Sequence, residues 1–146
     1  MSGEAGSNPK SRDPAERRHI SSGSPWEALA GYSRAVVDGN DVFVSGTVGV
    51  NLATMEFAPT AREQAEQAID TIAAALAQVP ATLDDVVRVR VYVPNRADVE
   101  QVSAVLACRL GRARPANTTV CAPLAVEAAK VEIEVTARVR GAASAP

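Results

Sequence analysis

The sequence predicts an α+β domain in which a mixed six-stranded sheet carries two helices on one of its faces. Six short segments are rich in β-branched residues, and two longer segments repeat apolar residues at helical spacing. Their order along the chain reads β-β-β-α-β-α-β-β. Two helices can cover only one face of such a sheet. The other face is therefore left to solvent or to a partner.

The strands are recognised by alternation and by the turn residues between them. They are expected at residues 18–21, 33–37, 41–47, 86–93, 117–122 and 130–140. An Asp-Gly-Asn tripeptide at 38–40 can supply the left-handed backbone of a tight hairpin. In the fourth strand Val87, Val89, Val91 and Val93 are expected to share one face, with charged residues opposite.

Two amphipathic helices are expected at residues 60–79 and 98–110. Thr60 followed three residues later by Glu63 forms the pattern of a capping box. Asp98 is the predicted N-cap of the second helix. Apolar residues expected on the buried stripes are Ala61, Ala65, Ala68, Ile69, Ile72, Leu76, Val79, Val99, Val102, Leu106 and Leu110.

The chain is expected to form one domain with a tail at each end. Residues 1–17 are rich in Ser, Gly, Pro and charge, and such a segment cannot offset the entropy lost on ordering. The domain is expected over residues 18–141, with a short tail at 142–146. The length of 146 residues is enough for one hydrophobic core.

Composition argues against several classes of partner. Fifteen Lys and Arg against 17 Asp and Glu leave a net charge of −2, which gives no electrostatic footprint for nucleic acid. No apolar run approaches the roughly 20 residues of a membrane span, and no signal-peptide core is evident. One His and two Cys cannot make a four-ligand zinc site. We therefore expect a cytoplasmic protein that uses neither a metal nor another cofactor.

Several local strings, taken in order and with their spacing, resemble the Rid family, also called YjgF or L-PSP. They span most of the chain between residues 20 and 140. The matching strings are GYSRA at 31–35, VFVSGT at 42–47, DDVVR at 84–88, RPANTTV at 114–120 and VEIEV at 131–135.

The resemblance implies a chorismate-mutase-like fold assembled as a homotrimer, with three clefts between adjacent subunits. It also implies hydrolysis of 2-imino or 2-enamino acids to the 2-keto acid and ammonia. That chemistry asks for a cation to hold the substrate carboxylate, N–H donors and a carboxylate that orients water.

At one functional position the sequence departs from the family pattern. The family places its clamp Arg directly after Pro-Ala, and this chain has Asn117 there. An amide offers neutral donors in place of a charged bidentate fork, which implies roughly ten- to hundredfold weaker holding of a carboxylate. Arg114 precedes the proline and is expected on a different part of the loop.

Two further arginines leave alternatives open. Arg88 or Arg90 could supply the missing cation, or could pair with Glu132 or Glu134 across the open face of the sheet. Glu134 resembles the family's water-orienting carboxylate and is the candidate catalytic residue. Its alternative is a structural ion pair with Arg90.

The remaining candidates would bind the ligand. Tyr32 and Ser45 resemble cleft residues, although Tyr32 could instead pack on the trimer surface and Ser45 could be a turn-adjacent hydroxyl. Trp26 lies in a polar segment that is expected to be a loop. Its side chain could anchor a subunit interface or form a wall of the cleft. The full substrate-binding set is Trp26, Tyr32, Ser45, Ser103, Asn117, Thr118 and Thr119.

Three functions follow from this reasoning. The first is action on a small imine-, enamine- or carbonyl-type metabolite, with weak or absent 2-iminoacid deaminase activity because of Asn117. The second is a non-catalytic small-molecule-binding module that uses the same cleft. The third, prompted by the family's endoribonuclease and translation-inhibitor labels, is RNA cleavage, which the acidic balance and the single His disfavour. Cys108 and Cys121 are expected to be buried thiols.

Overall fold

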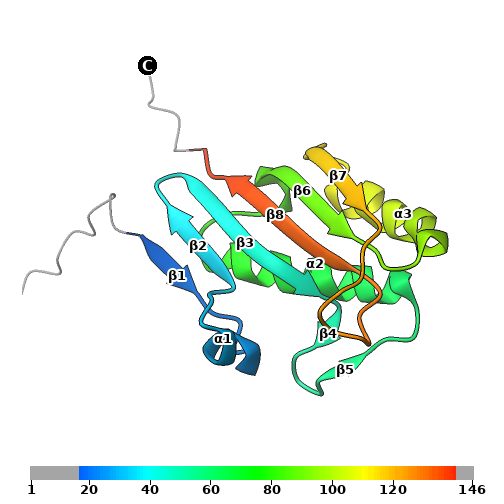
Figure 1. The fold of residues 1–146 in the computed structure, drawn as a ribbon. Coiled ribbons are helices and arrows are strands. Elements are labelled where there is room, and N and C mark those ends of the chain that lie inside the picture. Colours follow the sequence, from blue (N-terminus) through cyan, green and yellow to red (C-terminus); the bar gives the residue numbers. More distant parts are fainter. Residues whose placement is uncertain (1–16, 141–146) are drawn as a thin grey trace, which may run out of the picture.

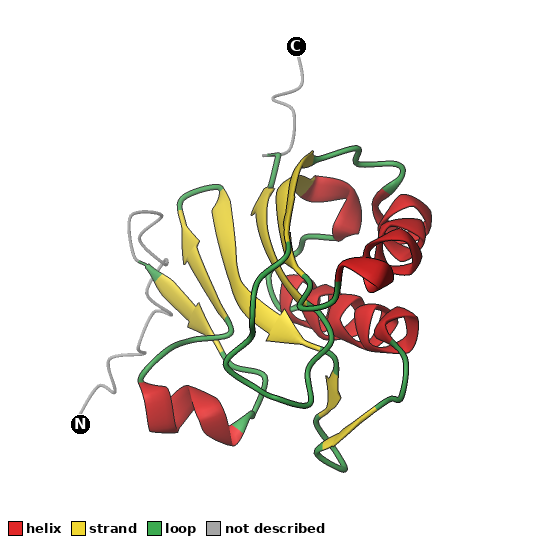
Figure 2. Ribbon diagram, turned by 45° about the vertical axis from the view of Figure 1, so that its right-hand side comes forward, coloured by secondary structure: helices red, strands yellow, loops and turns green. Residues whose placement is uncertain are grey.

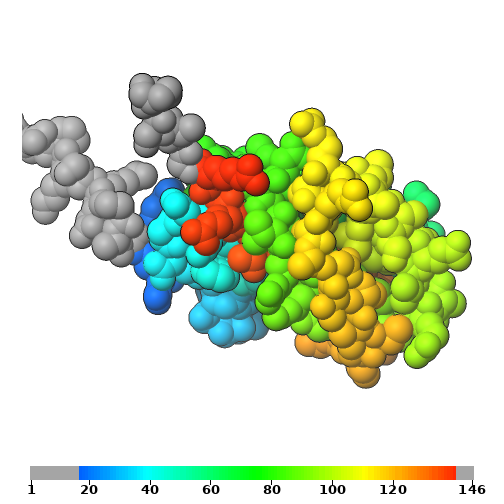
Figure 3. Space-filling view, turned by 90° about the horizontal axis from the view of Figure 1, so that it is seen from above, coloured from blue at the N-terminus to red at the C-terminus, as the bar shows by residue number. Residues whose placement is uncertain are grey.

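The computed structural model describes residues 17–140, so the predicted tails lie outside this range apart from Arg17. A six-stranded sheet runs in the order β1-β2-β3-β8-β6-β7 (Figure 1). Seen from above, the colours follow that order from blue through cyan, red and green to yellow (Figure 3). The strands are β1 (Arg18–Ile20), β2 (Ala35–Asp38), β3 (Asp41–Val48), β6 (Val86–Tyr92), β7 (Ala116–Val120) and β8 (Glu132–Arg138).

The sheet is mixed, as predicted. β6 and β7 pair in parallel, and every other neighbouring pair in this sheet is antiparallel. β1 and β7 are the two edges. All five residues of β7 are exposed, so its outer edge is free to meet a partner.

Two longer helices, α2 (Ala61–Ala77) and α3 (Val99–Leu110), lie together on one face of the sheet (Figure 2). The predicted two-helix layer is therefore confirmed. The apolar residues predicted for the first helix are all buried, and those of the second are buried apart from the partly buried Val99. No helix in the described range has both the length and the apolar character needed to cross a bilayer.

The starts of the two helices differ. The Thr60 hydroxyl accepts a hydrogen bond from the Glu63 N–H, and the Glu63 carboxylate accepts one from the Thr60 N–H, so the predicted capping box is confirmed. Asp98 occupies the N-cap position of α3, as predicted, but its side chain makes no capping hydrogen bond within the described residues. The chain enters α3 through a 3₁₀ turn, η2 (Arg96–Asp98), and Asn95 caps that turn instead.

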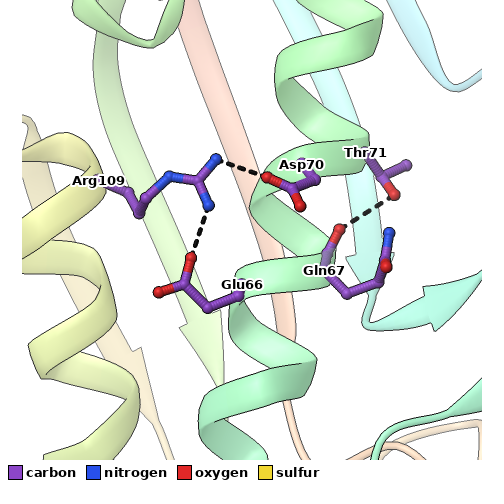
Figure 4. Close-up of polar contacts among 5 residues, drawn as sticks. All are labelled: Glu66, Gln67, Asp70, Thr71 and Arg109. Carbon is purple, nitrogen blue, oxygen red and sulfur yellow. Dashed lines mark hydrogen bonds and ion pairs between the residues drawn. The ribbon is translucent and has the colours of Figure 1, made fainter.

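Arg109 ties the two helices together on their exposed side (Figure 4). Its guanidinium donates to Glu66 at 2.6 Å and to Asp70 at 2.7 Å. Both acids lie on α2, one turn apart, and Arg109 reaches them from α3. This network links the two helices on the side that faces solvent, where such pairs contribute about 0.2–1 kcal/mol.

The alternation predicted for the strand at residues 86–93 is wrong at Val87. Val87 is 49% exposed, whereas Val86 is buried. Val86 pairs with Ala137 and Arg88 with Thr136, so Val87 is the extra residue of a β-bulge. A bulge shifts the face on which a side chain lies, and a strict two-residue period does not reveal it.

Several short elements were not predicted. Residues expected to form a loop around Trp26 form α1 (Pro25–Ala30), which lies near the end of β1, away from α2 and α3 (Figure 2). Ser24 and Glu27 make a capping box there, and Pro25 fits the first helical turn. The other unpredicted elements are β4 (Val50–Asn51), β5 (Glu56–Phe57) and η1 (Leu83–Asp85).

Candidate functional site

The first hollow, named here the Tyr32 pocket, lies between α1, the end of β3, the start of β8 and the loop after β7. Its volume is about 240 Å³. Most of its wall is apolar. The residues that line it are Ser24, Trp26, Leu29, Ala30, Tyr32, Arg34, Gly46, Thr47, Val48, Val50, Leu52, Thr71, Ala125, Val126 and Glu132.

A buried arginine forms the polar end of the Tyr32 pocket. Arg34 is 4% exposed. Its Nη1 donates to the Gly46 carbonyl at 3.0 Å and to the Thr47 hydroxyl at 2.8 Å. Its Nη2 donates to the Tyr32 hydroxyl at 3.3 Å, and the guanidinium carbon lies 5.6 Å from the centroid of the Tyr32 ring. Its Nε is buried without a hydrogen-bond partner.

A carboxylate stands in the same pocket. Burial, reinforced by the negative charge of Glu134, raises the pKa of Glu132 above its usual value, although Arg34 opposes the shift. A Cβ on Gly46 would overlap the Glu132 carboxylate, so this approach depends on glycine. Glu132 is thus a half-buried acid with a raised pKa, positioned where it could give or take a proton.

Helix α1 carries Trp26 into the pocket wall. Glu27 anchors this helix by accepting from the backbone N–H of Ser22 and of Ser24 and from the Ser22 hydroxyl. Burial opposes ionisation of Glu27, but the Ser22 hydrogen bonds outweigh it and hold its pKa below the usual value. The helix and its tryptophan are therefore held in place by a buried acid.

The second hollow, named here the Asn117 groove, lies between β7 and α3 and has a volume of about 570 Å³. Thr119 donates to the Asn117 side-chain oxygen at 3.0 Å. Arg114 was expected to lie elsewhere, but it also lines this groove and adopts a left-handed backbone with a φ of 47°. The residues that line it are Val89, Ser103, Leu106, Ala107, Leu110, Gly111, Arg114, Pro115, Asn117 and Thr119.

Glu134 lies on the open face of the sheet. Its carboxylate accepts from Arg90 at 3.2 Å and from the Tyr92 hydroxyl at 3.2 Å. The predicted alternative of an Arg90 ion pair is therefore present. Arg88 lines the same shallow depression, and no ion pair joins it to an acid within residues 17–140.

The predicted site residues do not converge within one chain. Trp26 and Tyr32 line the Tyr32 pocket, whereas Ser103, Asn117 and Thr119 line the Asn117 groove. Three others lie outside both hollows. The Ser45 hydroxyl donates to the Ser33 carbonyl at 2.7 Å, Thr118 pairs with Arg90 on the neighbouring strand, and Glu134 is ion-paired.

Sequence reasoning missed Arg34 and misjudged Glu132 as a surface charge. A charged residue at the start of a strand has the pattern of an exposed position, and nothing local marked Arg34 as buried. The prediction of buried cysteines was wrong as well, because Cys108 and Cys121 are both exposed in the chain. Within residues 17–140 no three His, Cys, Asp or Glu side chains gather as a metal site would require.

Comparison with known proteins decides the family. The family model described as endoribonuclease L-PSP matches residues 23–139. The chain belongs to the Rid (YjgF/L-PSP) family. The Rid match includes both hollows, because it begins before α1 and ends after β8.

Rid relatives are similar along most of their length. A 2-iminobutanoate/2-iminopropanoate deaminase of Dermatophagoides farinae is 32% identical over 81% of this chain and 93% of its own. The structure of Rv2704 of Mycobacterium tuberculosis, from the YjgF/YER057c/UK114 family, is 38% identical, with a TM-score of 0.77 over 85% of this chain and 100% of its own. Yeast Mmf1 is 26% identical, with a TM-score of 0.78 over 86% of this chain and 100% of its own.

Proposed function

We propose that this Rid-family chain forms a homotrimer and acts on a small imine-, enamine- or carbonyl-type metabolite between subunits. The cleft would join the Tyr32 pocket of one subunit to the Asn117 groove of its neighbour. The observation that carries the proposal is the division of the predicted residues between two hollows of one chain. A shared cleft would reunite them, and the exposed edge strand β7 beside the Asn117 groove supports such an arrangement.

Glu132 is the group best suited to handle protons in this cleft. In the proposed reaction its carboxylate accepts a proton from water while the water oxygen bonds to the carbon of the C=N group. With a protonated imine as substrate, Glu132 then returns this proton to the nitrogen of the adduct, and the C–N bond breaks to release ammonia. The hydroxyl group on carbon loses its proton to solvent, and a C=O group remains. A carboxylate whose pKa is raised by burial is a stronger base than an exposed one, which supports Glu132 over the ion-paired Glu134 for this role.

Asn117 sets the expected rate. A neutral amide holds a carboxylate less firmly than a guanidinium, so we expect weak or absent turnover of 2-iminoacids. Asn117 would instead bind an uncharged oxygen of the ligand, with the backbone of Thr118 and Thr119 beside it.

The test compares hydrolysis of 2-iminopropionate by the natural chain and by Asn117→Arg, with Asn117→Gln as the matched neutral control. We expect the Arg variant to raise kcat/KM roughly ten- to hundredfold, while the Gln variant stays near the natural value. Equal rates for the natural chain and Asn117→Arg would contradict the argument from charge.

The subunit arrangement has its own test. Light scattering in solution should give three times the mass of the chain. A monomeric mass would remove the shared cleft, because the two hollows could not then meet.

A non-catalytic binding module is the second candidate, and Asn117 is the observation that favours it. Such a module would bind the metabolite saturably without consuming it, so mass spectrometry of the ligand after incubation distinguishes the two. RNA cleavage is not favoured, because the chain has a net charge of −2 and a single His.

A further inference from the structure

Arg34 is a buried cation that forms no ion pair with any acid among residues 17–140. It is 4% exposed, and its three hydrogen bonds go to neutral oxygens, namely the Gly46 carbonyl and the Thr47 and Tyr32 hydroxyls. A guanidinium has five N–H groups, so two are unused here, and the Nε group is buried without a partner. Taking a charge out of water is costly unless an opposite charge compensates it.

Two acids compensate this charge only in part. The charge of Arg34 acts to lower the pKa of Glu27 and of Glu132, although burial leaves the pKa of Glu132 raised overall, and Glu132 lines the same pocket as Arg34. Within residues 17–140, however, no carboxylate forms an ion pair with Arg34. Glu27 is already held by its hydrogen bonds to Ser22 and Ser24.

We infer that Arg34 is the anion-recognition residue of the Tyr32 pocket, and that the ligand is a small carboxylate with an apolar end. The inference rests on the proposed function in taking the Tyr32 pocket as a ligand site, and it adds the charge of the ligand. A carboxylate held by Arg34 would lie in the Tyr32 pocket and not beside Asn117, so the expectation of slow 2-iminoacid turnover, which rests on the Asn117 position, is unchanged.

Tyr32 completes the recognition of the carboxylate. Its hydroxyl oxygen accepts from Arg34, so its own proton is free to be donated to an anion. The remaining N–H of Nη2 lies beside it. Together they offer two donors, one of them charged, and charge-assisted hydrogen bonds are the stronger kind.

The rest of the pocket limits the other end of the ligand. Trp26, Leu29, Val48 and Val126 supply apolar surface. The volume of about 240 Å³ is smaller than the roughly 300–1,000 Å³ of pockets for drug-sized ligands. A short aliphatic chain therefore fits, and a nucleotide does not.

The experiment measures binding of two matched probes, butyrate and its uncharged amide, butyramide. Trp26 is the chain's one tryptophan and lines this pocket, so its fluorescence reports binding there. We expect butyrate to change this fluorescence and to bind at least tenfold more tightly than butyramide to the natural chain.

Three variants test which arginine binds the carboxylate of butyrate. Arg34→Gln should bring the affinity for butyrate down to that for butyramide. Arg112→Gln removes the same charge from a side chain that is 88% exposed, and should leave both affinities unchanged. Arg114→Gln removes the exposed cation of the Asn117 groove and should weaken butyrate binding less than Arg34→Gln does.

Three results would overturn the inference. They are equal binding of acid and amide, no fluorescence change with either, or a loss of butyrate binding in Arg114→Gln comparable to that in Arg34→Gln. If Arg34→Gln does not fold, Tyr32→Phe keeps the inference testable, because removing the donor should weaken butyrate several-fold and leave butyramide unchanged. Hydrolysis of 2-iminopropionate is measured in a separate assay. A failure of the butyrate-binding test would therefore contradict the role of Arg34 without deciding whether the protein catalyses the proposed reaction.

Discussion

The Tyr32 pocket and the Asn117 groove differ in where their charge lies and how it is held. In the Tyr32 pocket both charged groups, Arg34 and Glu132, are wholly or partly buried. In the Asn117 groove the central amide, Asn117, and the cation, Arg114, are both exposed. Burial strengthens electrostatic interactions, so charge changes in the Tyr32 pocket should have larger effects than those in the groove.

The largest effect is expected from Gly46→Ala. The added methyl group would overlap the Glu132 carboxylate, which is the end of a flexible side chain and can rotate away at little cost in stability. Turnover should be lost because the acid is displaced, while the midpoint of urea unfolding should change little. Ser103→Ala in the Asn117 groove is the control for stability, and its midpoint should be unchanged. Unaltered turnover in Gly46→Ala would mean that Glu132 does not act in the reaction.

Glu132→Gln should stabilise the fold at neutral pH while abolishing turnover. The folded pKa of Glu132 is raised, so its ionised form costs stability as the pH rises above the ordinary value of 4.5, and the cost is absent below it. The gain of the Gln variant should therefore appear at pH 7 and vanish below about pH 4.5, as measured by urea unfolding at several pH values.

The matched control is Glu134→Gln. The charge of Glu134 helps to raise the pKa of Glu132, so this variant should move that pKa downward. The measurement is the pH dependence of turnover. If Glu134→Gln abolishes turnover while Glu132→Gln retains it, the catalytic assignment reverts to Glu134.

A smaller effect is expected on the open face of the sheet. Arg90→Gln breaks an ion pair whose two side chains are 49% and 33% exposed. Pairs of this kind contribute about 0.2–1 kcal/mol, and salt screens them. The loss should shrink as sodium chloride is raised in the unfolding buffer, and a loss that is independent of salt would point to packing instead.

The smallest effect on stability is expected from Asn117→Ala. The change removes one exposed hydrogen bond to Thr119, and surface substitutions of this kind fall within about 0.5 kcal/mol. Thermal unfolding of the dilute protein checks this. A large loss of stability that depends on protein concentration would show that Asn117 is buried between subunits.

The sheet and its two covering helices could be predicted because their patterns repeat over many residues. The capping box at Thr60 and the buried stripe of α2 are local features, and both were confirmed. The bulge at Val87 could not be predicted from alternation, since one inserted residue leaves the sequence pattern intact on both sides. Helix α1 carried a signal that was passed over, the capping box formed by Ser24 and Glu27.

The candidate site was harder to predict, because burial of charge is a property of the whole fold. Glu132 and Glu134 are two residues apart on β8, and each lies between two β-branched apolar residues in the sequence. Only the neighbouring segments distinguish them, since one faces Arg34 and Gly46 and the other faces Arg90. Alternation and turn residues located the strand segments, whereas the pairing of side chains depended on tertiary contacts.

Gln64 has a consequence for the range of ligand sizes. This buried amide donates to the Ala58 and Ala128 carbonyls and accepts from the Lys130 N–H, so it fastens the returning end of the loop that carries Ala125 and Val126. With that end anchored to α2, widening the cavity would require a longer connection between residues 121 and 127. Redesign for bulkier molecules should therefore begin by altering loop length, and trimming individual side chains of the wall should achieve less.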